Sequence, residues 1–116
     1  MHELPITQRI LEIVLEHARG RNIRKIVRIH LKIGALSDLE QEWIQRYFDY
    51  LSRGTLAEQA ELAVRRTPIV MLCRSCGRRF EVGRHEWDHA RCPGCDAARV
   101  ELIAGREYLV ENMEVL

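Results

Sequence analysis

The sequence predicts an α+β protein in which two helices cover one face of a three-stranded sheet, with a small cysteine-containing unit inserted before the last strand. Three observations predict this fold. Two stretches space their apolar residues as a helix does, four stretches look extended, and two CxxC pairs lie in a segment of different composition. The chain has 116 residues, which suffices for one modest core with an appended unit.

The first helix is expected over residues 4–18, where apolar residues recur at intervals of three and four. Pro5 suits a first helical turn because its missing N–H leaves no bond unmade, and Gly20 can adopt the left-handed conformation that ends a helix. Residues 27–33 then alternate apolar and charged side chains. This alternation predicts a half-buried strand whose apolar side faces the first helix.

A second helix is expected to begin after Ser37 or Asp38, either of which could cap it. Its spacing predicts a buried face made of Leu39, Trp43, Ile44, Tyr47, Phe48 and Leu51. A second strand follows around residues 62–66, before Pro68. After the cysteine-containing segment, residues 100–103 look extended and residues 108–115 predict the last strand.

The segment from Met71 to Arg99 has four cysteines, three glycines and little helical periodicity. It therefore predicts a separate folding unit. We expect one α/β domain formed by residues 1–68 and 100–116, interrupted by a small domain of residues 69–99.

The four cysteines form two CxxC pairs, Cys73–Cys76 and Cys92–Cys95. A two-residue gap lets both sulfurs of a pair turn inward, and two such pairs complete the tetrahedral S₄ shell that zinc prefers in closed structural sites. Six arginines and four acids lie between Met71 and Arg99, so the local charge can neutralise a Zn(thiolate)₄ centre. The sequence thus predicts a zinc-ribbon-like zinc domain.

The four cysteines also allow three other interpretations. Disulfides are disfavoured under reducing conditions. Iron in a rubredoxin-like S₄ site remains an alternative because geometry barely separates iron from zinc. A catalytic zinc would need an open position, which four thiolates do not leave.

The first three residues, Met1, His2 and Glu3, form a candidate nickel site. A free α-amine, the amide nitrogen of His2 and its imidazole can close adjacent chelate rings on one metal, and the amide of Glu3 could add a fourth nitrogen. Coordination by backbone nitrogen requires loss of the amide proton, which tetragonal Ni(II) and Cu(II) promote and zinc rarely does. The alternative is a solvated terminal histidine.

Composition bounds the function. Eighteen Lys and Arg balance seventeen Asp and Glu, so the chain lacks the basic excess of a general polyanion binder. No apolar run reaches the length of a bilayer span, and no export signal is evident, so we expect a cytoplasmic protein without membrane insertion. No Ser-His-Asp, paired-carboxylate or phosphate-loop arrangement is present, which argues against an enzyme.

Together these features resemble the HypA/HybF family of nickel metallochaperones for hydrogenase maturation. The resemblance runs nearly the full chain and rests on MHE at residues 1–3, Lys32-Ile33-Gly34-Ala35-Leu36-Ser37, Gly54-Thr55-Leu56-Ala57, the paired CxxC motifs, Gly105-Arg106-Glu107-Tyr108 and Glu114-Val115.

The resemblance implies nickel binding by residues 1–3 and structural zinc on the four cysteines. It also implies delivery of nickel to the [NiFe]-hydrogenase large-subunit precursor with a HypB-type GTPase, and for some members a role with urease and its accessory proteins. His85 and His89 lie in the zinc segment, and His89 is the better candidate for an accessory nickel ligand because it is closer to Cys92.

The main rival is a zinc-ribbon module that binds nucleic acid through arginines on phosphates, with Phe80 and Trp87 stacking on bases. It leaves the MHE motif and the larger α/β domain unexplained. We therefore expect no nucleic-acid partner.

Overall fold

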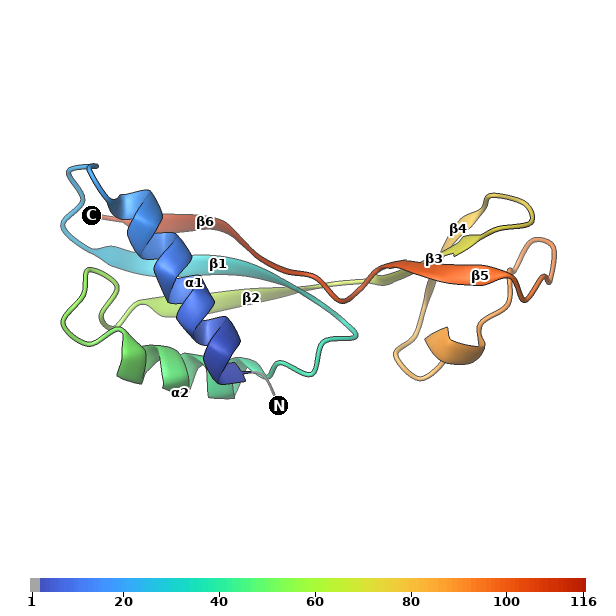
Figure 1. The fold of residues 1–116 in the computed structure, drawn as a ribbon, viewed down its shortest axis with the longest axis horizontal. Helices are drawn as coiled ribbons and strands as arrows, with labels where there is room; N and C mark the ends of the chain where they lie inside the picture. Colours follow the sequence, from blue (N-terminus) through green and yellow to red (C-terminus); the bar gives the residue numbers. More distant parts are fainter. Residues whose placement is uncertain (1–2) are drawn as a thin grey trace. The chain divides into compact units, whose positions relative to one another are not determined.

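The computed structural model describes residues 3–116 (Figure 1), which form two compact units. The first unit takes the described residues up to Lys32 together with Asp38–Arg65 and Tyr108–Leu116, and the second takes Ile33–Ser37 and Arg66–Glu107. The elements along the chain are α1 (Glu3–Ala18), β1 (Ile26–Gly34), α2 (Gln41–Leu51), β2 (Glu61–Thr67), β3 (Ile69–Cys73), β4 (Arg79–Val82), the 3₁₀ turn η1 (Trp87–His89), β5 (Val100–Ala104) and β6 (Tyr108–Val115).

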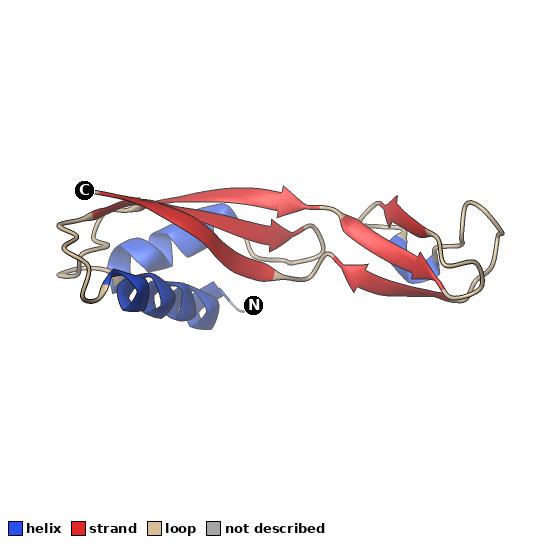
Figure 2. Ribbon diagram, turned by 90° about the horizontal axis from the view of Figure 1, so that it is seen from above, coloured by secondary structure: helices blue, strands red, loops and turns tan. Residues whose placement is uncertain are grey.

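The first unit contains a three-stranded sheet in the order β2-β1-β6. Figure 2 shows both helices on one side of this sheet. This confirms the predicted fold. The helices and strands meet in a core of side chains with at most 1% exposure, among them Ile10, Val14, Ile29, Leu31, Ile44, Phe48 and Leu62. Burial of each of these apolar side chains contributes about 1.5–3 kcal/mol.

The start of α2 differs from the expectation. Its N-cap is Glu40, which makes no side-chain capping bond, and neither Ser37 nor Asp38 caps the helix. The preceding residues are engaged elsewhere, because the backbone N–H of Ala35 donates to Thr67 O and that of Leu36 donates to Gly105 O. These bonds hold the segment in a turn, so the helix can begin only after it.

The second unit contains a three-stranded antiparallel sheet in the order β4-β3-β5. Met71 on the central strand pairs with Phe80 on β4 and with Leu102 on β5. Residues 100–107 therefore belong to this unit, as do 33–37 and 66–68, whereas the sequence placed the second domain at 69–99. The reason is that β5 completes the sheet on which the first CxxC pair stands.

Two glycines meet where the chain enters and leaves the second unit. A Cβ on Gly34 would lie 2.1 Å from the carbonyl oxygen of Gly105, so the two backbones approach as only glycine permits. Glu107 stabilises the crossing, because its carboxylate accepts hydrogen bonds from the N–H of Gly105 and from Thr67 Oγ1, both at 2.7 Å. These bonds, that from Gly105 foremost, lower the pKa of Glu107.

This carboxylate predicts a pH dependence of stability. Because its pKa is lowered by folding, its contribution is fully present above its ordinary value of 4.5 and is lost as the pH falls through the folded value. Glu107→Gln should therefore lower the free energy of unfolding at neutral pH. It should also make the decrease in that free energy between neutral and acidic pH smaller than in native protein. Urea midpoints measured across that range check this, with Glu81→Gln as the matched removal of an exposed carboxylate. Equal pH dependence in native protein and Glu107→Gln would contradict the assignment.

Within residues 3–116, no helix has the length and apolar character needed to cross a bilayer.

Candidate metal centre

Two tight turns carry the four cysteines. Cys73 ends β3 and is 1% exposed, while Cys76 lies on the turn that follows. The N–H of Gly77 donates to Cys73 O and closes this turn, and Gly77 has φ +79°, a conformation that glycine adopts without strain. The second turn is closed in the same way by a hydrogen bond from the N–H of Asp96 to the carbonyl oxygen of Cys92, which is buried.

The four sulfurs converge on one point. All four Sγ atoms lie within 4.8 Å of one another, with 3.6 Å between Cys73 and Cys95 and 3.5 Å between Cys76 and Cys92. A tetrahedral zinc with Zn–S bonds of about 2.3 Å separates its sulfurs by roughly 3.8 Å, so the cluster fits this ion. The cysteines are free thiols, which argues against the disulfide alternative.

Hydrogen bonds from the backbone prepare individual sulfurs for ligation. The N–H of Cys76 points at Cys73 Sγ (3.4 Å) and that of Gly94 at Cys92 Sγ (3.3 Å). The bond from Cys76 is the main cause that lowers the pKa of Cys73 to about 6. At Cys95, the N–H of Ala97 lowers the pKa, but the adjacent sulfurs and burial outweigh it and raise the pKa to about 12.

This contrast between neighbouring thiols has a simple cause. Once one sulfur in so small a space is a thiolate, its charge opposes ionisation of the next. A divalent cation at the centre would remove that opposition and allow all four thiolates together. The donor set thus fits a bound metal better than it fits four isolated thiols.

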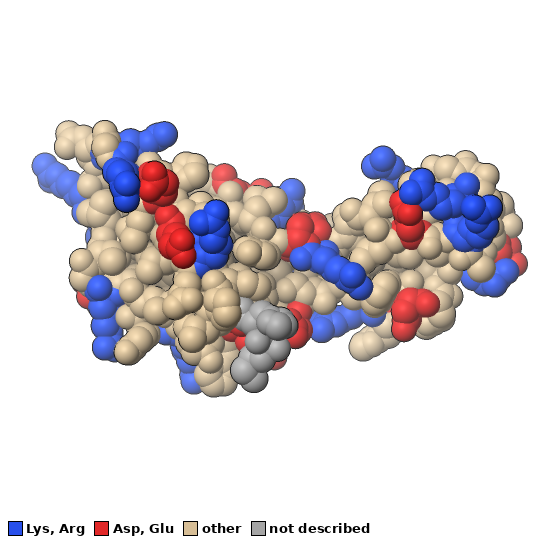
Figure 3. Space-filling view, viewed as in Figure 1, with Lys and Arg blue, Asp and Glu red and all other residues tan. Residues whose placement is uncertain are grey.

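Arginines lie on or beside both CxxC turns. Figure 3 shows basic side chains on the second unit, all of which are arginines. Arg78 packs on the second CxxC turn, with Nη1 3.0 Å from where a Cβ of Gly94 would stand. Arg74 pairs with Glu101, and Arg91 pairs with Asp96 at 3.1 Å. Such cations can offset the charge of −2 on a Zn(thiolate)₄ centre.

The predicted nickel ligands are only partly within the described structure. Met1 and His2 lie outside the described residues. Glu3 is the first residue of α1 and only 8% exposed, and its carbonyl oxygen accepts a hydrogen bond from Thr7 Oγ1. The third predicted ligand is thus fixed at the start of a packed helix.

The histidines of the second unit are both exposed. His89 Nδ1 lies 3.0 Å from Asp88 Oδ1. Among residues 3–116, the four cysteines form the one group of three or more metal-binding side chains that lie close together. An accessory nickel role for His89 stays a prediction.

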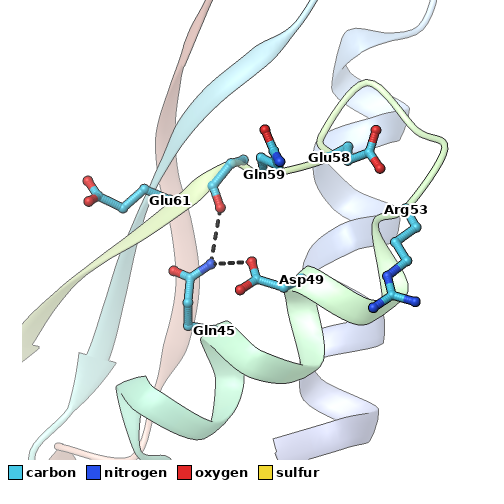
Figure 4. Close-up of a pocket in the computed structure, with 7 residues that line it drawn as sticks. Gln45, Asp49, Arg53, Glu58, Gln59 and Glu61 are labelled. Atoms are coloured by element: carbon cyan, nitrogen blue, oxygen red, sulfur yellow. Dashed lines mark hydrogen bonds between the residues drawn. The ribbon is translucent and has the colours of Figure 1, made fainter.

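One hollow in the first unit was not foreseen from the sequence. It has a volume of about 540 Å³ and is lined by residues of α2, the following loop and β2 (Figure 4). Gln45 organises it, because its amide nitrogen donates to Asp49 Oδ1 (2.8 Å) and to Ala60 O (3.1 Å), while its amide oxygen accepts from the N–H of Leu62 (2.8 Å). These bonds tie α2 to the start of β2.

Comparison with known proteins covers the entire chain. A family model described as hydrogenase/urease nickel incorporation, metallochaperone, HypA matches residues 1–115. Hydrogenase maturation factor HypA of Dehalococcoides mccartyi strain 195 is 38% identical over 99% of this chain and 94% of the relative, and that of Acidithiobacillus ferrooxidans is 35% identical over 99% of both.

Solved structures share the fold. The solution structure of the Ni metallochaperone HypA from Helicobacter pylori has a TM-score of 0.72 at 23% identity, over 100% of this chain and 98% of that one. A second solution structure of a HypA protein has a TM-score of 0.77 at 22% identity, over 100% and 97%. Because a family model and close relatives both match almost the full length, the chain belongs to the HypA family, whose members are nickel metallochaperones with structural zinc rather than enzymes.

Proposed function

We propose that this protein binds Ni(II) through Met1, His2 and Glu3, holds structural zinc on Cys73, Cys76, Cys92 and Cys95, and delivers the nickel during [NiFe]-hydrogenase maturation. The observation that carries the proposal is the convergence of four sulfurs within 4.8 Å in a chain whose match to the HypA family includes the MHE start. The nucleic-acid alternative addresses the second unit alone.

The start of α1 supports nickel binding at Glu3. The first N–H groups of a helix have no intrahelical acceptor, so the amide of Glu3 is free to lose its proton to a metal. A helix N-terminus repels a bare cation. Two deprotonated amides, those of His2 and Glu3, would cancel the charge of Ni(II), so the complex would meet no such repulsion.

Transfer requires that the nickel be released. Ligation by an amine and by amide nitrogens competes with protons, so the affinity for nickel should fall steeply as the pH drops. The recipients that fit are the hydrogenase large-subunit precursor and a HypB-type GTPase, with urease accessory proteins as the other family route. We place this work in the cytoplasm, because a reducing compartment keeps the four cysteines from forming disulfides and so leaves them available to zinc.

Metal titration of the full chain, with its natural first residue, tests the nickel site. Native protein should bind Ni(II) with the visible absorption of a planar nitrogen complex, because four in-plane nitrogens impose that geometry. Acetylation of the α-amine, or His2→Ala, should abolish this step and leave zinc content and fold unchanged.

His17→Ala is the matched control, since His17 is an exposed histidine of α1. It should bind nickel as native protein does. Undiminished nickel affinity after acetylation or in His2→Ala would place the site elsewhere.

A further inference from the structure

The solvent-facing side of α2 carries aromatic side chains, which are unusual on an exposed helix surface. It consists of three aromatic residues and one arginine of α2 together with a second arginine just after the helix ends, and we call it the aromatic–arginine face (Trp43, Arg46, Tyr47, Tyr50 and Arg53). The opposite face of the helix is already committed to the core through Ile44 and Phe48, which are fully buried. Both sides of the helix therefore carry large apolar groups, and the first unit covers only the side with Ile44 and Phe48.

The exposure of this face departs from what the sequence predicts. Trp43 was expected in the core but is 45% exposed, and Tyr50 is 66% exposed. The reason is the helical phase, since Ile44 and Phe48 fill the space against the sheet. Trp, Tyr and Arg are the residue types that carry most binding energy in protein interfaces, while a merely solvated helix face is made of smaller or charged side chains.

Contacts within the face hold its rings in place. The guanidinium carbon of Arg46 lies 5.2 Å from the ring centre of Trp43, and that of Arg53 lies 5.1 Å from Tyr50. The rings of Trp43 and Tyr47 are 6.1 Å apart. Side chains that are ordered before binding lose little conformational entropy when a partner docks.

The charge on this face selects the partner. Arg46 donates one hydrogen bond, from Nη2, to Glu42 Oε1 (2.8 Å), and the other N–H groups of its guanidinium remain available. Figure 4 shows Arg53 directed away from Glu58 and Glu61, and no carboxylate of the described chain forms an ion pair with it. Arg46 lies in α2 and Arg53 lies two residues beyond its end. Ser52 between the helix and Arg53 keeps right-handed helical backbone angles, so about two helical turns, or roughly 10 Å, separate the two arginines.

We propose that the aromatic–arginine face docks an acidic amphipathic helical segment of a partner protein. Two carboxylates of that segment, spaced about two turns apart, would pair with Arg46 and Arg53. Apolar side chains between them would cover Trp43 and Tyr50. The proposal does not depend on where nickel binds, so it stands or falls separately from the metal assignment.

Peptide titration of the full, zinc-loaded protein tests this. The probe is a helical peptide with Glu at two positions seven residues apart and Leu between them, and its counterpart has Lys in place of Glu. The Glu peptide should shift the indole N–H signal of Trp43 in ¹⁵N spectra and leave that of Trp87, in the second unit, unmoved. Arg46→Glu with Arg53→Glu should weaken the Glu peptide about tenfold or more and favour the Lys peptide.

Arg9→Glu with Arg19→Glu is the matched control, because it reverses two exposed arginines on α1 and just after it, which pair with Glu12 and Glu16 and lie outside the aromatic–arginine face. It should bind the Glu peptide as native protein does, whereas Trp43→Ala should lose it. Equal binding of both peptides, self-association through Trp43 without peptide, or tighter binding of a single-stranded oligonucleotide at this face would overturn the proposal.

Discussion

Cys73→Ser is expected to unfold the second unit and to leave the first unit folded. The second unit buries few apolar side chains, chiefly Ile33, Ile69 and Met71 beside the cysteines, so its own core contributes little. A structural zinc site contributes about 10–16 kcal/mol of apparent binding free energy in small domains. That amount matches or exceeds the whole stability of a typical domain, so its loss should not be tolerated.

The two tryptophans report the units separately. In Cys73→Ser, the indole signal of Trp87 should collapse to its unfolded position, zinc content should fall to zero, and Trp43 should keep its native signal. Chelation of zinc from native protein should give the same spectrum. Ser75→Ala lies between the first two cysteines and should retain zinc and fold. A second unit that stays folded without metal would contradict the structural role.

Gly34→Ala is expected to produce the second-largest effect. The added Cβ would stand 2.1 Å from Gly105 O and 2.7 Å from the backbone N of Arg106, and neither atom belongs to a side chain that could turn away. One backbone or the other must move, which breaks the bonds from the N–H of Gly34 to Glu107 O and from that of Leu36 to Gly105 O. We expect a loss of about 4 kcal/mol or more.

Gly20→Ala separates this clash from a general cost of replacing glycine. Gly20 has φ +74°, and a Cβ there would meet nothing within 4 Å. Its replacement should cost only the conformational strain, about 1–2 kcal/mol. Urea unfolding of both variants, with zinc bound, measures the difference. A loss at Gly34 no larger than that at Gly20 would show that the two strands separate easily.

Much of the fold could be predicted from local sequence patterns, namely the spacing of apolar residues and of cysteines. Alternation over residues 27–33 predicts β1, helical spacing predicts α1 and α2, and the CxxC spacing predicts four sulfurs that do converge. Each of these signals is set by side-chain periodicity or by a short loop, so no long-range information is needed.

The remainder depends on contacts between distant residues. Nothing local shows that Val100–Ala104 pairs with Ile69–Cys73 rather than with the larger sheet, so the domain boundary was placed too early. The exposure of Trp43 is likewise decided by which helical phase Ile44 and Phe48 impose against the sheet. The start of α2 was missed because Ala35 and Leu36 bond to Thr67 and Gly105, far along the chain.

The bond between Thr67 and Glu107 joins the end of β2, which leads into the cysteine-bearing insertion, to the residue just before β6, where the chain leaves it. When the two ends of an insertion lie next to each other, the insertion can become longer or shorter or be replaced without disturbing the fold of the domain that contains it. Evolution could therefore vary the loop between the two CxxC turns while α1 stays untouched.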